Sequence, residues 1–260
     1  MQFRGPPVHR ELCDRRALPY DAGHSMRRRD WPPGVLAVAL GLVVLGRVAQ
    51  ASSPSTASLL DFVTFDQIDY IRFADEPGRT LTRDDLGMEF ATVACSIGED
   101  NRNCSYGLDG GAAFLPAGTR VYAVRGYATE FRLAAVWRDH VYLYQAWRNP
   151  RARVGGALFD IAGKVRSIEV WRGEPTPEAA GRSALIAARE DVDALVGMIV
   201  RGTTRRPVAH AAGEPRYWLT FWLSDGTTLG RSYFPETDEV MGGVIVAGEF
   251  RAVLDRYLVR

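Results

Sequence analysis

Hydrophobic and polar residues alternate along the middle of the chain with the two-residue period of β-strands. In the stretch TEFRLAAVW, Phe131, Leu133, Ala135 and Trp137 fall on one face, and HVYLYQAW continues the alternation. Arg138-Asp139 lies between the two stretches, where a tight turn is expected. Upstream, FVTFDQIDYIRF reads as two short strands joined at Asp66-Gln67. These patterns predict an antiparallel β meander that packs on one face.

The second half mixes the strand period with the helix period. Apolar residues at Val192, Leu195, Val196 and Ile199 follow the spacing of one helix face, and Gly202 fits the end of that helix. KVRSIEVW reads as a strand, Asp225-Gly226 as the turn of a hairpin, and Val240 to Val246 as a further strand. A terminal amphipathic helix is predicted from the apolar positions Phe250, Val253, Leu254, Tyr257 and Leu258.

The fold class predicted from these elements is α+β, in which a disulfide-bearing β meander is followed by a β-α-β-β-β-α unit. Composition changes after Asn149-Pro150, and Gly155-Gly156 offers a seam. We therefore expect a β-rich module at residues 60–155 and an α+β module at residues 156–260, packed together through their shared aromatic residues.

The first 51 residues differ from the rest of the chain. Three consecutive arginines at 27–29 precede the uncharged run Gly34–Gly46, and Ala49-Gln50-Ala51 closes it. This is the pattern of a cleaved secretory signal, because the run is shorter than the roughly 18 residues that a spanning helix needs. Residues 1–25 are unusually long for such a leader, so that Met26 is a plausible true start, and residues 52–59 read as a flexible linker. The alternative is an uncleaved leader that anchors the protein to a membrane.

The 260-residue chain has a formal net charge of +1, but the leader supplies the excess of arginine. Without residues 1–51 it has 24 basic and 27 acidic residues, a net charge of −3. Nucleic acids and anionic lipids bind clustered cations, so neither is expected as a partner, and the membrane is expected only through an uncleaved leader.

Cysteine usage agrees with export. Cys13 lies in the leader, which leaves the pair Cys95 and Cys104 around the polar loop SIGEDNRN. We predict a disulfide, because such a pair bonds in an oxidising compartment and the spacing fits neither a redox motif nor a metal site. The loop also carries oxygen ligands that depart from the calcium-loop spacing, so a solvated loop is favoured over a metal site. Its oxygen-bearing residues are Glu99, Asp100, Asn101, Asn103 and Asp109.

Recognised catalytic and cofactor motifs are missing from the sequence. His140 and His210 are the only histidines after residue 51, and the chain contains no nucleophile elbow, phosphate loop or dinucleotide fingerprint. We therefore predict no metal and no cofactor, and an enzyme is the less favoured class. A hydrolase built on His140 or His210 with a carboxylate and a hydroxyl stays open as the alternative.

The strand Arg216–Leu223 is apolar on both faces. Trp218 and Trp222 share one face, and Trp171 lies on a neighbouring predicted strand. Burial of at least one of Trp218 and Trp222 between two layers is favoured. If the face is open, the three tryptophans form a platform for sugar rings or for the apolar patch of a partner.

Several stretches together resemble a group of uncharacterised exported proteins and lipoproteins of Gram-positive-type bacteria. They are FVTFDQIDYIRF, DDLGMEFATV, AAFLPAGTRVYAVRGY and EFRLAA, although this chain has no lipobox cysteine. The resemblance covers roughly residues 60–260 and implies an extracytoplasmic address without a known activity. We predict a secreted or cell-envelope protein that binds a ligand or an envelope protein through a β-surface. The alternatives are a small secreted hydrolase and a membrane-anchored extracytoplasmic sensory domain.

Overall fold

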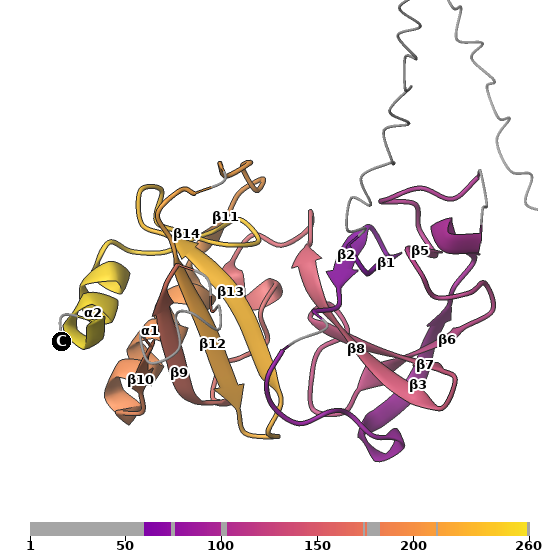
Figure 1. Ribbon diagram of the computed structural model, residues 1–260, viewed down its shortest axis with the longest axis horizontal. Coiled ribbons are helices and arrows are strands. Elements are labelled where there is room, and N and C mark those ends of the chain that lie inside the picture. The colour runs from indigo at the N-terminus through magenta and orange to yellow at the C-terminus, as the bar shows by residue number, and fades with distance from the viewer. Residues whose placement is uncertain are drawn as a thin grey trace, which may run out of the picture. The chain divides into compact units, whose positions relative to one another are not determined.

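The computed structural model describes residues 60–73, 76–99, 103–173, 175, 183–211 and 213–258. The predicted signal peptide (1–51) and linker (52–59) lie outside these residues. The described residues are mostly β-sheet with two helices, which confirms the α+β class (Figure 1). They belong to one compact unit.

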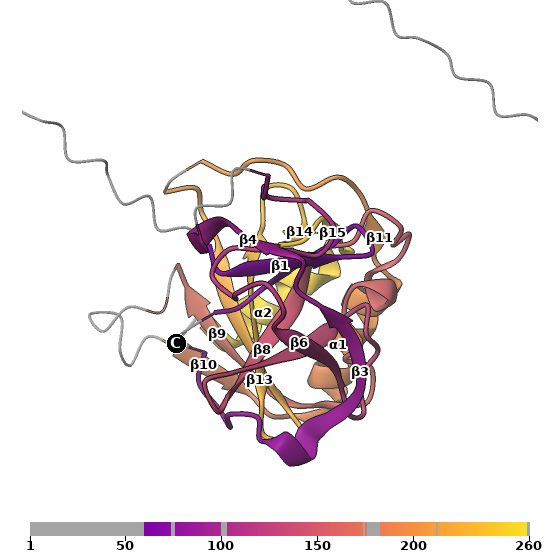
Figure 2. The same ribbon diagram turned by 90° about the vertical axis from the view of Figure 1, so that its right-hand side faces the viewer.

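The first sheet has the strand order β3-β6-β7-β8-β2-β1-β5-β4 and pairs antiparallel except for β4 with β5. Figure 2 looks onto its side of the molecule, with β1, β3 and β6 towards the viewer. Its strands are β1 (Phe62–Phe65), β2 (Ile68–Ile71), β3 (Leu86–Thr92), β4 (Cys95–Ser96), β5 (Gly111–Ala112), β6 (Arg120–Val124), β7 (Arg132–Trp137) and β8 (His140–Arg148).

Two of its hairpins turn where the sequence predicts. Asp66 and Gln67 take left-handed backbone angles (φ 51° and 63°) between β1 and β2, and Arg138 and Asp139 do the same (49° and 61°) between β7 and β8. Such two-residue turns match the twist of antiparallel strands. The short 3-10 helix Arg83–Asp85, which leads into β3, has Thr82 as its N-cap residue.

The second sheet has the order β10-β9-β12-β13-β14-β15-β11. Its chain order differs from the predicted six-element unit. One strand precedes the first helix at 183–186, a short strand follows that helix at 203–204, and two short strands follow the main hairpin. The strands are β9 (Val165–Arg172), β10 (Ser183–Ile186), β11 (Thr203–Thr204), β12 (Tyr217–Leu223), β13 (Thr228–Phe234), β14 (Glu239–Val240) and β15 (Val244–Ile245).

Both helices pack on the second sheet. The four apolar positions that predict α1 (Arg189–Arg201) are its buried residues, and Gly202 caps it. Helix α2 (Glu249–Leu258) buries Phe250 and Leu254, as its periodicity predicts. Figure 1 shows α1 and α2 beside β9 and β10, on the side of this sheet away from the first sheet.

One continuous hydrophobic core links the strands of both sheets and the two helices. The first sheet takes its strands from residues 62–148 and the second from residues 165–245, on either side of a short 3-10 helix, Gly155–Ala157. Residues 72–73 and 76–80, which we call the crossing segment, lie between β2 and the second sheet, where Glu76 Oε1 accepts the amide of Gly230 at 2.9 Å. We call the contact zone between the two sheets the seam.

Candidate functional site

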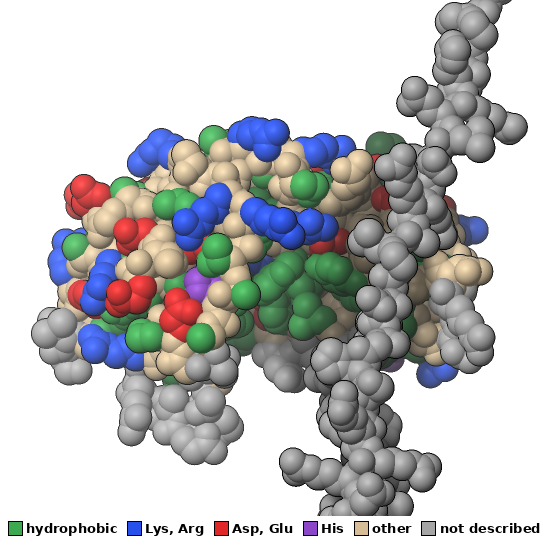
Figure 3. Space-filling model, turned by 90° about the horizontal axis from the view of Figure 1, so that it is seen from above, with side chains coloured by type: hydrophobic (Ala, Val, Ile, Leu, Met, Phe, Trp, Pro, Cys, Tyr) green, Lys and Arg blue, Asp and Glu red, His purple; other side chains and the backbone are tan. Residues whose placement is uncertain are grey.

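Four aromatic side chains form a patch at the seam. Trp171 on β9 and Trp218 on β12 are direct cross-strand partners. Phe73, from the crossing segment, contacts Trp218 (ring centroids 6.4 Å apart) and Trp147 on β8 (6.1 Å). All four are partly buried, so each packs against its neighbours and keeps some exposed surface. On the face shown in Figure 3, hydrophobic side chains gather in one area and Lys and Arg side chains lie beside it.

The tryptophan face of β12 is neither fully buried nor open. Trp218 and Trp222 are both partly buried, whereas Tyr217, Leu219 and Phe221 on the opposite face are buried. The predicted burial of at least one of Trp218 and Trp222 between two layers is thus met only in part, because each side chain keeps some exposed surface. Phe73 of the crossing segment covers part of this face by contacting Trp218. No ring contact joins Trp222 to another described aromatic residue.

A glycine lets Trp218 lie flat on the sheet. A Cβ atom added at Gly230 of β13 would lie 2.5 Å from Cζ2 of the Trp218 ring, far inside contact distance. The indole Nε1 donates to Thr220 Oγ1 at 3.2 Å. The hydrogen bond to Thr220 fixes the orientation of the ring, and the absence of a side chain at Gly230 leaves the space that the ring occupies.

Next to the patch, a buried arginine of each sheet donates hydrogen bonds to the other sheet. Arg132 of β7 donates to Thr227 Oγ1 and to the carbonyl oxygen of Thr228, both at 2.7 Å. Arg231 of β13 donates to the carbonyl oxygen of Ala146 at 2.9 Å and lies 5.6 Å from the centre of the Phe73 ring. Both guanidinium groups are about 1 % exposed or less, so they bind the sheets together in an environment nearly free of solvent.

Glu76 supplies a negative charge near Arg231, and Oδ2 of Asp225 lies 3.8 Å from Nη1 of Arg132. Glu76 Oε2 accepts from Gln145 Nε2 at 2.8 Å. Burial raises the pKa of Glu76, and the charge of Arg231 is the main opposing influence. Burial also lowers the pKa of Arg231 to about 10, with Glu76 opposing that change. The seam therefore holds charges whose cost of desolvation is offset by their proximity.

His140 lines a cavity of about 260 Å³ at the seam, together with Arg72, Glu76 and Thr227. The cavity holds the groups that a hydrolase would need, but they are not assembled. Among the described residues, His140 donates to no carboxylate or hydroxyl, and its closest ring neighbour is Tyr142 at 6.1 Å. Glu76 and Thr227 are instead engaged in the seam.

His210 lies elsewhere and has a structural setting. Its ring stacks on Phe234 at 3.4 Å, and Nδ1 lies 3.1 Å from Glu214. Its Nε2 is 3.8 Å from the buried Glu239. The stacked ring connects the loop before β12 to the second sheet. No hydroxyl of the described residues is bonded to it, so it forms no Ser-His-Asp set.

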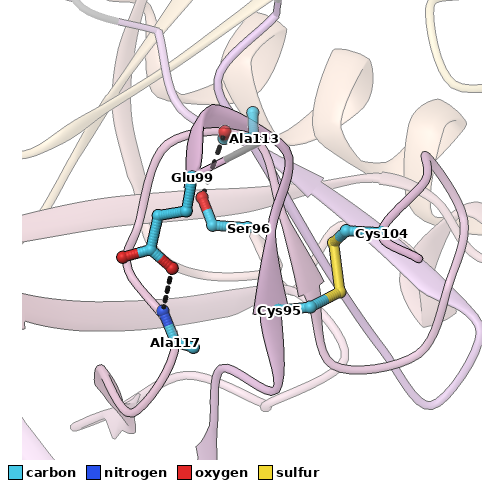
Figure 4. Close-up of a disulfide and its surroundings, with 6 residues drawn as sticks. All are labelled: Cys95, Ser96, Glu99, Cys104, Ala113 and Ala117. Atoms are coloured by element: carbon cyan, nitrogen blue, oxygen red, sulfur yellow. Dashed lines mark hydrogen bonds between the residues drawn. A yellow bond between two sulfur atoms is a disulfide. The ribbon is translucent and has the colours of Figure 1, made fainter. Parts of the chain in front are cut away.

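The predicted disulfide is present. Cys95 and Cys104 are bonded, with Cα atoms 5.7 Å apart (Figure 4). In the same loop, Glu99 Oε2 accepts the amide of Ala117 at 3.1 Å, so this carboxylate fixes the backbone. Asp100 and Asn101 lie outside the described residues. Within the described ranges, no three His, Cys, Asp or Glu side chains are grouped as a metal site.

The sequence analysis named Trp171 and Trp218 as candidate binding residues but not the two rings beside them, Phe73 and Trp147. Phe73 and Trp147 come from the other sheet's half of the chain, and Arg132, Arg231 and Glu76 look like surface charges in a single sequence.

Comparison with protein-family models, curated proteins and solved structures yields no match. Neither helix of the described residues has the length and hydropathy to cross a membrane.

Proposed function

We propose that this chain is an exported, non-enzymatic binding protein of the cell envelope, and that the aromatic patch (Phe73, Trp147, Trp171 and Trp218) is its ligand surface. The observation that carries the proposal is the partly exposed cross-strand pair Trp171 and Trp218, extended across the seam by two further rings. Rigid aromatic side chains offer a large contact area at little cost in conformational entropy.

The ligand class that fits these rings best is the sugar rings of a polysaccharide. Sugar rings present flat C–H faces that stack on indole, and they suit a shallow surface better than a deep apolar pocket would. The orientation of Trp218 is already fixed by Thr220 and Gly230, so binding costs little ordering of this ring.

Titration of the full chain with chitohexaose, a soluble oligomer of N-acetylglucosamine, tests the proposal. Intrinsic tryptophan fluorescence is expected to change saturably, and Trp171→Ala or Trp218→Ala should weaken binding by about tenfold or more, as removal of a central aromatic contact does. Trp137→Ala is the matched control, since Trp137 stacks with Arg138 at the β7–β8 turn instead. Equal losses in all three variants, or no saturable change, would contradict this function.

Export is tested separately. If residues 1–51 are removed during secretion, the intact mass of the protein recovered outside the cytoplasm should correspond to a chain beginning at Ser52. Recovery of the uncleaved chain in the membrane fraction would favour the anchored alternative.

A further inference from the structure

A second cavity, of about 480 Å³, lies between the loop after β8 and the loop after β11. Its two walls are tied together by the backbone. The amide of Thr204 donates to the carbonyl oxygen of Arg153 at 3.1 Å, and its hydroxyl donates to that of Ala152 at 2.6 Å. The amide of Arg205 donates to Gly243 at 2.8 Å. The cavity is therefore part of the folded framework.

Four arginines line this cavity: Arg148 and Arg153 from one wall, Arg205 and Arg206 from the other. Two of them are held by buried carboxylates. Arg148 Nε donates at 2.8 Å to Asp69, which is fully buried.

Arg205 Nη2 donates at 2.9 Å to Glu239, which is 1 % exposed. A buried carboxylate has few alternative positions, so it fixes the guanidinium that it binds.

The fixed arginines keep free donors. Asp69 engages Arg148 through Nε alone, and neither terminal nitrogen of Arg148 has a hydrogen-bond partner among the described residues. Arg153 and Arg206 form no ion pair with any described carboxylate. Two of the four positive charges are thus uncompensated in one cavity, and like charges at close range repel each other until an anion neutralises them.

We propose that this cavity binds a small anion that carries at least two negative charges on phosphate or carboxylate oxygens. Guanidinium groups present paired N–H donors whose spacing matches both kinds of oxyanion. The volume also leaves room for a group that bears the anion. This site is independent of the aromatic patch, so either proposal can fail alone.

Isothermal titration of the full chain with pyrophosphate, and in parallel with citrate, tests the site at low ionic strength. Saturable binding at one site per chain is expected with at least one of them, and the stronger ligand identifies phosphate or carboxylate as the preferred group. Arg153→Ala and Arg206→Ala should each weaken binding about tenfold, because each removes a charged donor but no described ion pair. Arg206→Lys keeps the charge without the fork and should restore only part of the affinity.

Arg120→Ala is the matched control. It also removes one positive charge from an exposed arginine, which pairs with Glu89 on the first sheet and does not line the cavity. Its affinity should equal that of the unchanged protein, and the thermal midpoints of all variants report that they are folded. A loss in Arg120→Ala as large as in Arg153→Ala would show unspecific charge attraction and overturn the proposal. No saturable binding of either anion would overturn it too.

Discussion

Different kinds of interaction stabilise the two faces of the β12–β13 hairpin. On the face towards the helices, Leu219 and Phe221 belong to the same apolar core as α1 and α2. The helix period of the sequence predicts the buried positions of both helices. At the seam, Arg132 and Arg231 donate hydrogen bonds from one sheet to the other, and the nearby Glu76 supplies a negative charge. An apolar contact tolerates changes of similar volume, whereas a buried charge depends on each partner. The difference predicts which substitutions each region withstands.

The largest effect is expected at the seam. Arg231→Met keeps much of the side-chain volume but removes the charge beside Glu76 and the bond to Ala146, so the free energy of unfolding should fall by about 3–5 kcal/mol. Urea titration measures the change.

The double variant Arg231→Met with Glu76→Gln sharpens this test. It removes both charges, so it should be less destabilised than the sum of the two single variants. Strict additivity would mean that Glu76 and Arg231 do not stabilise each other, and the comparison would lose its basis.

On the helix side, a smaller loss is expected from an apolar truncation. Leu219→Ala should lower the free energy of unfolding by about 3 kcal/mol, because Leu219 is fully buried and leaves a cavity. Leu185→Ala on β10, the edge strand of the same sheet, is the control; Leu185 is 59 % exposed, so its loss should stay within about 0.5 kcal/mol. Similar urea midpoints for the two variants would refute the assignment of the core to this face.

Much of the local structure in both sheets and in α1 could be predicted from the sequence, because local spacing and residue type specify it. Asp66-Gln67 and Asp225-Gly226 mark turns by their residue types, and the apolar spacing of α1 marks its buried face. These signals involve residues close together in the chain.

The seam could not be predicted in this way. Arg132 alternates with apolar neighbours, which is typical of a solvent-facing position, yet β7 is covered on both faces at this point. What covers it is the hairpin turn near Thr227, about a hundred residues away. For the same reason the contact between Phe73 and Trp218 could not be predicted, because no local pattern brings these two residues together.

An intermediate effect is expected where the seam meets the patch. Gly230→Ala places a methyl group against the Trp218 ring, so the ring or the strand has to move, at a cost of about 2 kcal/mol. Tryptophan fluorescence should change together with stability. The control is Gly197→Ala in α1, where the added Cβ meets only the flexible end of Arg201; this variant should be stabilised by about 0.5–1 kcal/mol. Unchanged fluorescence in Gly230→Ala would contradict the packing of Trp218 on Gly230.

The smallest effect on stability is expected at the rim of the seam, where Arg79 and Asp85 lie beside the β12–β13 turn, and it depends on pH. Asp85 accepts two bonds from Arg79, which also donates to the carbonyl oxygen of Asp225 in the hairpin turn. The hydrogen bonds from Arg79 lower the pKa of Asp85 to about 2, below its usual value of 3.8. A carboxyl with a lowered pKa in the folded state stabilises the protein above the unfolded value and loses this contribution as the pH falls from 3.8 towards 2. Because the pair is partly exposed, the contribution is about 1 kcal/mol.

Asp85→Asn should therefore be less stable than the unchanged protein at pH 6, and the difference should shrink between pH 4 and pH 2. A difference that stays constant over this range in urea titrations would show that the charge of Asp85 is not what joins the rim to the second sheet.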